Sequence, residues 1–240
     1  MWYKRARGFQ KPLLGAQIAW GHPLSKGLTA CFLFNQKTDF LVYDLVNTAR
    51  TNVVPNGGTK PSWSTGRIGQ CIQFINANDW VEIPVNQSTD FDFVSGFSIV
   101  TSFNFSAQQS DSGLFGKSTT DTGGYAGYFI WNNANTCDFY INGGVRADST
   151  RTILANTWYQ YVAQWDTRNA QIYIDGRLDV STAYTTAPNS VGQIFYIGKY
   201  NYGSRTFPGK MDYLYIYRRY LTPAEIYWLY KEPYCFIQGP

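Results

Sequence analysis

The sequence has few of the residues from which most active sites are built. Its 240 residues include a single histidine, His22, and only three glutamates, Glu82, Glu225 and Glu232. A single histidine excludes a zinc site with several histidine ligands, and His22 stands in a Pro-flanked stretch outside any Ser/His/Asp or Cys/His arrangement. We therefore expect no nucleophilic triad and no zinc chemistry.

Charge is also sparse, at 15% of residues, with a net charge of +4. The basic residues are scattered except for Lys4, Arg5, Arg7 and Lys11, whereas a nucleic-acid-binding protein usually gathers them into one stripe. We expect no nucleic-acid partner. The N-terminal cluster predicts either an arm that docks on an acidic partner surface or a solvated tail.

Cysteines are few and far apart: Cys31, Cys71, Cys137 and Cys235 have neither metal-ligand spacing nor the density of a disulfide-stapled scaffold. We expect reduced, buried thiols. The first fifteen residues lack the apolar core of a secretory signal, and no apolar run approaches the ~20 residues of a membrane span. These observations predict synthesis in a cytoplasm and no membrane partner.

Aromatic residues are abundant, at 18% of the chain, and they favour β-sheet. Residues 97–106 alternate strictly, with Phe97, Ile99, Thr101, Phe103 and Phe105 on one face and smaller or polar residues on the other. The pair Asp175-Gly176 predicts a type I′ hairpin turn, and Asn142-Gly143 predicts another. Further strands are predicted at 29–35, 40–45, 71–75, 80–84, 125–131, 158–166, 193–199 and 210–218.

Regular strands with one wet face each predict an all-β antiparallel sandwich of two packed sheets. One helix is predicted at about 222–231, because Thr222-Pro223 and Glu225 form a capping sequence before an apolar face. The expected organisation is an extended N-terminal arm (1–27), one domain (28–232) and a C-terminal tail (233–240). One face of a predicted strand carries Met211, Tyr213, Tyr215 and Tyr217. We expect this aromatic face to be covered, and in a homo-oligomer another subunit would cover it.

Several segments, in order, resemble the laminin-G-like, concanavalin A-like jelly-roll domains. They are residues 66–74, 78–84, 97–99, 114–117, 158–166, 172–176, 197–198, 209–217 and 221–226. The resemblance implies a jelly-roll fold over residues 28–232. Glucanases of this fold carry a Glu-x-Asp-x-x-Glu strand motif, which is absent here, and the one Asp-x-Asp pair, Asp90 and Asp92, is better explained by turn capping. We therefore expect a non-enzymatic protein, with polysaccharide hydrolysis as a remote alternative.

The two ends, residues 22–35 and 229–236, resemble the flanks of laminin-G-like proteins encoded by tailed bacteriophages. This resemblance implies a virion structural or decoration protein. Its expected partners are capsid or tail proteins, contacted through the arm and the tail, and it would be located in the virion. The alternative is a carbohydrate-binding adhesin that recognises a cell-surface glycan.

Related jelly rolls hold a Ca²⁺ ion at a sheet rim, and the positions that match are Asp79 and Asp212. The alternative is that both carboxylates accept hydrogen bonds from loop amides. No other cofactor is implied.

Exposed aromatics beside amide and basic side chains are typical of glycan sites, and two segments carry them. Each aromatic has the alternative role of core or interface contact. The candidates are Tyr125, Tyr128, Trp131, Asn132 and Asn133 in the first segment and Tyr200, Asn201, Tyr202 and Arg205 in the second.

Overall fold

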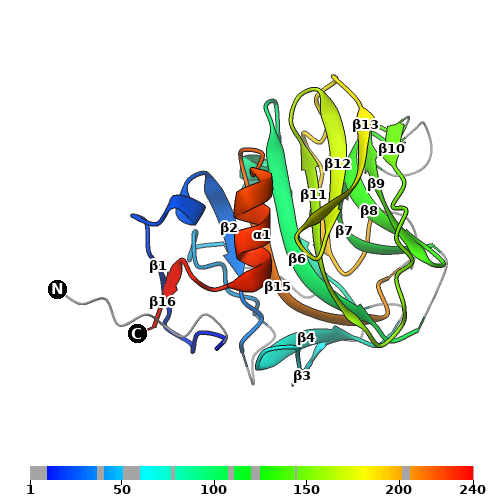
Figure 1. The fold of residues 1–240 in the computed structure, drawn as a ribbon. Coiled ribbons are helices and arrows are strands. Elements are labelled where there is room, and N and C mark those ends of the chain that lie inside the picture. The colour runs from blue at the N-terminus through cyan, green and yellow to red at the C-terminus, as the bar shows by residue number, and fades with distance from the viewer. Residues whose placement is uncertain are drawn as a thin grey trace.

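The structure is a computed structural model that describes residues 10–36, 41–50, 60–76, 79–107, 111–119, 125–143, 145–201 and 206–239. Over these residues two antiparallel sheets pack face to face, and one short helix lies against the larger sheet (Figure 1). The expected all-β sandwich with a short C-terminal helix is confirmed. No helix in the described residues is long and apolar enough to cross a membrane.

The smaller sheet has six described strands. In spatial order these are β10 (Val145–Ala147), β9 (Thr136–Ile141), β8 (Gly127–Asn133), β7 (Ser112–Ser118), β14 (Phe195–Ile197) and β5 (Val81–Ile83). Short 3₁₀ turns at Val85–Gln87 and Thr89–Phe91 lead from β5 towards the larger sheet.

The larger sheet has eight described strands. Seven follow the order β13 (Arg177–Ala183), β12 (Asn169–Ile174), β11 (Trp158–Trp165), β6 (Phe97–Phe105), β15 (Gly209–Tyr217), β4 (Gln70–Phe74) and β3 (Ser62–Thr65). The eighth, β2 (Leu28–Phe32), pairs with the second half of β15, while β4 pairs with its first half.

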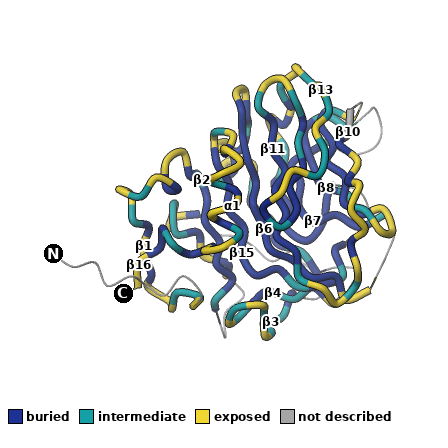
Figure 2. The backbone as a smooth tube through the Cα atoms, viewed as in Figure 1, coloured by how far each residue is buried: buried dark blue, intermediate teal, exposed yellow. Residues whose placement is uncertain are grey.

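The main core lies between the two sheets and is rich in aromatic rings. Phe97 stacks on Phe93 at 4.3 Å between ring centroids, and Phe103 contacts Phe105 edge to face at 5.1 Å. These side chains come from alternate positions of β6 and its neighbours, as the period-two pattern predicted. Figure 2 shows the buried strands of both sheets and the exposed loops at their ends.

The outer face of the larger sheet carries a second core, built by the two ends of the chain. Helix α1 (Pro223–Lys231) contributes Ile226 and Leu229, which pack with Tyr213, Tyr215 and Tyr217 of β15. The aromatic strand face of Tyr213, Tyr215 and Tyr217 is thus covered by the chain's own C-terminal segment rather than by another subunit.

The N-terminal segment completes this second core. Strand β1 (Gln17–Ile18) pairs with β16 (Ile237–Gln238), so that the two ends lie side by side (Figure 1). The 3₁₀ turn at Pro23–Ser25 follows, and Leu24 is fully buried. The prediction of an extended arm is therefore wrong for residues 10–27, and the tail is likewise folded through residue 239.

The face of β6 that was predicted to be exposed to solvent is buried. Ser98, Val100 and Ser102 are all at most 1% exposed, because the second core covers them. Ser98 Oγ lies 2.9 Å from Gln164 Oε1 and accepts a hydrogen bond from Leu221 N, which satisfies a polar group in a buried position.

The turns and the helix that short sequence motifs predicted are present in the structure. Asp175 and Gly176 both have positive φ (51° and 77°), as the type I′ turn requires, and Asn142 and Gly143 do the same (51° and 68°). Thr222 and Glu225 form the expected capping box. Residues 41–45 are not a strand, and Asp44 forms only an isolated bridge with Phe32.

All four cysteines are free thiols, and three of them are buried as expected. Cys235 is half-buried. Burial raises the pKa of each thiol, to about 11 for Cys71 and to about 12 for Cys235.

Candidate functional site

The outer face of the six-stranded sheet presents a line of residues in register across its strands. Tyr140 of β9 pairs with Phe129 of β8, which pairs with Gly116 of β7. Gly116 pairs with Tyr196 of β14, which pairs with Glu82 of β5. The neighbouring positions on each strand point into the core, so this line faces away from it.

Five aromatic rings gather over this face. Phe129 stacks between Tyr140 (4.8 Å between centroids, 8° between planes) and Tyr200 (5.0 Å, 14°). Trp131 lies 5.3 Å from Tyr140 and 6.2 Å from Tyr200, and Tyr125 lies 5.4 Å from Phe129. We call these five residues, Tyr125, Phe129, Trp131, Tyr140 and Tyr200, the aromatic platform.

Two glycines of β7 make room for the platform. A Cβ atom at Gly116 would lie 2.5 Å from Phe129 Cβ, and one at Gly113 would lie 2.6 Å from Tyr200 Cδ1. Asn201, the residue after Tyr200, donates a hydrogen bond to Ser118 O at the end of β7 (2.8 Å). The segment that carries Tyr200 is therefore fastened across β7.

Trp131 and Tyr125 are the members of the platform that reach solvent. Both are half-buried, whereas Phe129, Tyr140 and Tyr200 are at most 8% exposed. The indole nitrogen of Trp131 is buried and has no hydrogen-bond partner among the described residues. A buried donor without an acceptor is costly to the fold.

A second group on the same face lies beside the platform. Lys199 Nζ sits 3.9 Å from the centre of the Trp80 ring and 4.8 Å from that of Tyr196. Trp80 donates its indole N–H to Glu82 Oε1 (2.9 Å). Burial lowers the pKa of Lys199, and the nearby Glu82 carboxylate opposes that shift. Burial and Glu82 together raise the pKa of Tyr196 to about 12.

The predicted glycan residues separate into two groups. Tyr125, Trp131 and Tyr200 come together in the platform, and Asn201 anchors it. Asn133 is exposed at the end of β8. Tyr202 and Arg205 lie outside the described residues.

Two of the predicted glycan residues are core residues instead. Tyr128 is fully buried between the sheets, where its hydroxyl donates to Phe91 O, and Asn132 is 1% exposed and donates to Ser112 Oγ. Both sit on the opposite strand face from Trp131, because side chains alternate along β8.

Sequence reasoning missed Phe129 and Tyr140 on the platform, and Trp80, Tyr196 and Lys199 beside it. Period-two alternation in β8 and β9 could have placed Phe129 with Trp131 and Tyr140 with Asp138. It could not have aligned β8 with β9 or with the distant segment around residue 200, which depends on cross-strand register.

Asp79 and Asp212 do not combine into the predicted calcium site. Asp79 Oδ2 accepts hydrogen bonds from Ile75 N (2.8 Å) and Asn76 N (2.9 Å), beyond the end of β4. Asp212 contacts the β3–β4 turn at the other end of that strand, roughly 13 Å away by strand rise. Within the described residues no three His, Cys, Asp or Glu side chains gather as a metal site would need.

Asp212 is neutralised by Lys11, which was predicted to belong to a docking arm. Lys11 Nζ lies 3.1 Å from Asp212 Oδ1 and also donates to Gln70 O, while Tyr234 donates to Asp212 Oδ2 (3.2 Å). Burial lowers the pKa of Lys11 and raises that of Asp212, and their mutual attraction opposes both shifts. Lys11 thus fastens the N-terminal segment to the sheet. Lys4, Arg5 and Arg7 lie outside the described residues.

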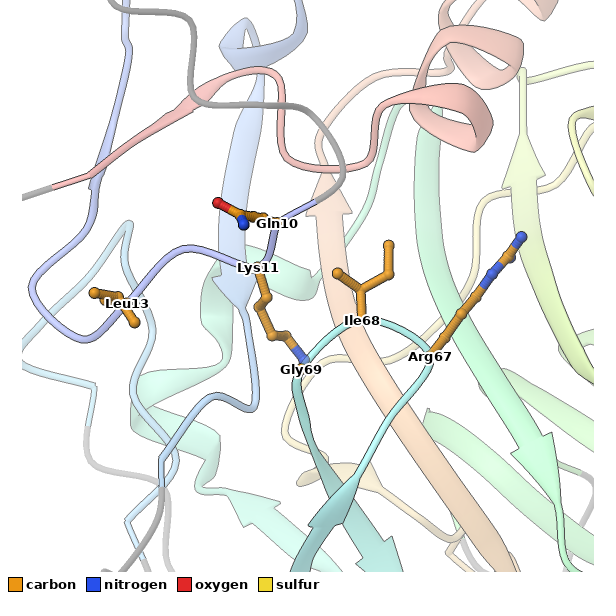
Figure 3. Close-up of a pocket in the computed structure, with 6 residues that line it drawn as sticks. All are labelled: Gln10, Lys11, Leu13, Arg67, Ile68 and Gly69. Atoms are coloured by element: carbon orange, nitrogen blue, oxygen red, sulfur yellow. The ribbon is translucent and has the colours of Figure 1, made fainter.

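A shallow groove runs beside this ion pair, between the N-terminal segment and the β3–β4 turn (Figure 3). Its lining includes Gln10 and Leu13 on one side and Arg67 and Ile68 on the other. The side chain of Lys11 runs towards the turn, and its ammonium is already hydrogen-bonded there. The aromatic platform is therefore the stronger candidate for a binding site.

Comparison with known protein families gives one match, to the concanavalin A-like lectin/glucanases superfamily (Laminin_G_3), over residues 76–227. The chain belongs to this family. The match covers most of the sandwich, including β5 to β15 and the start of α1, and so confirms the laminin-G-like resemblance. No curated protein sequence matches the chain.

Three solved structures with this fold show the kinds of protein in which it occurs. Domain 4 of AbnA, an extracellular GH43 arabinanase from Geobacillus stearothermophilus solved with arabinotriose, has a TM-score of 0.66 at 19% identity, covering 84% of this chain and 97% of that one. Trypanosoma rangeli sialidase has a TM-score of 0.64 at 18% identity, covering 85% of this chain and 33% of the enzyme. The binding domain of Paraclostridial Mosquitocidal Protein 1 has a TM-score of 0.65 at 16% identity, covering 88% and 53%.

The chain thus corresponds to one whole domain of the arabinanase and to about a third of the sialidase. At these identities the likeness concerns the fold alone.

Proposed function

We propose that this laminin-G-like chain is a non-enzymatic carbohydrate-binding domain whose ligand lies on the aromatic platform. The observation that carries the proposal is Trp131, a half-buried ring that reaches solvent on a sheet face and packs against the Tyr140 and Tyr200 rings. A sugar offers an apolar face that can stack on such a ring. The fold neighbours, an arabinanase domain solved with arabinotriose and a toxin binding domain, are consistent with this role.

The carboxylates of this face support binding rather than hydrolysis. On the strands where side chains are described, they are Glu82 on β5 and Asp138 on β9, four strand spacings apart, or roughly 19 Å. Glycosidases place their two carboxyl groups about 5 to 9.5 Å apart. Glu82 is hydrogen-bonded to Trp80, and Asp138 accepts from Ser149 N (3.2 Å).

The proposal is tested by screening the protein on an array of purified glycans and measuring the dissociation constant of the best ligand by calorimetry. Trp131→Ala should weaken binding about tenfold, since the sugar loses the ring on which it stacks. The control is Trp63→Ala, because Trp63 lies on β3 of the other sheet. Absence of any saturable glycan ligand, or equal effects of the two substitutions, would refute the proposal.

A virion structural role is the second proposal. It is favoured by three large apolar side chains on the N-terminal segment: Leu13 is 75% exposed, Leu14 is 55% and Trp20 is 60%. Exposed apolar side chains grouped on one segment are typical of a contact surface. Replacing all three by serine should abolish co-sedimentation with purified phage particles without lowering the melting temperature. Unchanged co-sedimentation, or no copies in any particle, would refute this role.

A further inference from the structure

Lys199 occupies an unusual position on the outer face of the six-stranded sheet. Only 8% of the residue is exposed, and its ammonium sits over the Trp80 ring and beside the Tyr196 ring. Aromatic faces attract a cation but accept none of its hydrogen bonds well. The two rings therefore hold the ammonium in place without saturating it.

Within the described residues, no hydrogen-bond acceptor or carboxylate pairs with Lys199 Nζ. The other buried lysines differ: Lys11 is paired with Asp212, and Lys117 donates to Asp92 Oδ1 and Ser88 O. Although Lys199 is largely buried, its Nζ atom is not fully enclosed by protein, so the ammonium reaches the surface. Lys199 is thus a fixed, accessible cation with three donors.

Glu82 is the carboxylate that influences Lys199 most. Its Oε1 accepts the Trp80 indole N–H, and this bond holds the ring that supports the ammonium. Glu82 therefore positions Trp80 and leaves the solvent side of Lys199 open to a ligand.

Lys199 is contiguous with the platform. It immediately precedes Tyr200, and Lys199, Thr206, Gly113 and Trp131 are consecutive partners across the sheet. A Cβ atom at Gly113, the partner of Trp131, would lie 2.8 Å from the carbonyl carbon of Lys199, and the Tyr200 ring lies 6.2 Å from that of Trp131, so Lys199 and Trp131 belong to the same part of this face.

We propose that the carbohydrate is an anionic oligosaccharide or polysaccharide, whose carboxylate or sulfate group binds Lys199 while a neighbouring sugar stacks on Trp131. This inference rests on the proposed carbohydrate-binding function and names the class of its ligand. Lys199 supplies charge complementarity, and Trp80 and Tyr196 supply its orientation.

The test uses an array with neutral, uronate-containing, sialylated and sulfated glycans. The best anionic ligand is then compared by calorimetry with its carboxyl-reduced or desulfated form, which separates carboxylate from sulfate recognition. The wild type should bind the anionic form about tenfold more tightly, as expected for a charge-assisted hydrogen bond. Added salt should weaken binding of the anionic form only.

Three variants isolate the role of Lys199. Lys199→Gln should abolish the preference for the anionic form, and Lys199→Arg should retain it. The matched control is Lys231→Gln, because Lys231 also lies over two aromatic rings, Tyr227 and Tyr230 at 5.3 Å each, but on α1 at the opposite side of the sandwich. Lys199→Arg keeps the inference testable if Lys199→Gln fails to fold.

The possible failures are distinct. Equal affinity for the anionic and neutralised glycans, both lost in Trp131→Ala, would overturn the role of Lys199 and leave the proposed function standing. A preference that persists in Lys199→Gln would do the same. Absence of any glycan ligand would overturn the proposed function itself.

Discussion

Tyr200 lies directly over Gly113, so that a Cβ atom at position 113 would fall 2.6 Å from the tyrosine ring. This contact allows a segment distant in sequence to close over β7 and to stack its ring on Phe129. The geometry of the aromatic platform therefore depends on a residue that has no side chain.

Gly113→Ala should displace Tyr200 and destabilise the fold by about 1 to 3 kcal/mol, because the added methyl group overpacks a backbone contact. Glycan affinity should fall with it. Urea denaturation and calorimetry measure the two effects. Gly21→Ala is the matched control, since a Cβ there meets no atom within 4 Å. Equal stabilities of the two variants would contradict the proposed packing.

Lys11→Met should lower the free energy of unfolding by about 3 to 5 kcal/mol, because Asp212 would remain as an unpaired buried charge. The double variant Lys11→Met/Asp212→Leu should recover part of that loss. Urea denaturation of the single and double variants measures both values.

The comparison for Lys11 is Arg151→Ala. It breaks a pair with Asp175 in which the arginine side chain is 46% exposed, and it should cost less than about 1 kcal/mol. A loss for Lys11→Met as small as that for Arg151→Ala would show that residues 10–12 are not fastened to the sheet in solution.

Stability should decline as the pH rises above about 9. Burial raises the pKa of Cys71 from 9.0 to about 11 and that of Cys235 from 9.0 to about 12, so between these values the folded chain holds protons that the unfolded chain releases. This stabilisation is complete below pH 9 and is lost as the pH approaches the folded values. Urea midpoints at pH 8, 9 and 10 measure the slope.

Cys235→Ala removes one of these groups and should make the decline shallower. The raised pKa also predicts slow reaction of native Cys235 with thiol reagents at pH 8. Identical midpoints at pH 8 and pH 10 would argue against buried, protonated thiols.

Thr222→Ala should destabilise the fold by about 1 kcal/mol, because it deletes the side chain that accepts a hydrogen bond from Glu225 N. Thr222→Ser keeps the hydroxyl and should stay close to the wild type. Thermal unfolding of the two variants measures the difference. An alanine variant as stable as the serine variant would show that α1 is held by packing alone.

The sequence predicted those features that depend on neighbouring residues. The turn at Asp175-Gly176 and the capping box at Thr222 each require only a short stretch of chain, and each is present in the structure. The alternation in β6 correctly placed its apolar face in the main core, but the opposite face, predicted to be solvated, is buried as well. These patterns predicted the sandwich, because two sheets that each have an apolar face bury those faces against each other.

What the sequence could not predict depends on register and on long-range pairing. Met211 was placed with Tyr213 on one face of a strand. A bulge between them sends Met211 into the main core with Leu214 and Ile216. Lys11 and Asp212, 201 positions apart, showed no sign of pairing. Trp131 and Tyr128 looked alike as candidates until the strand placed them on opposite faces.

The pairing of β1 with β16 brings both described ends of the chain to the side of the sandwich that α1 covers, away from the aromatic platform. Whatever is joined to either end, whether a resin, a probe or another protein, is therefore attached behind the platform. A fusion at residue 10 or residue 239 should immobilise the domain with its sugar-facing side turned outward, which makes either end a suitable anchor for a biosensor surface.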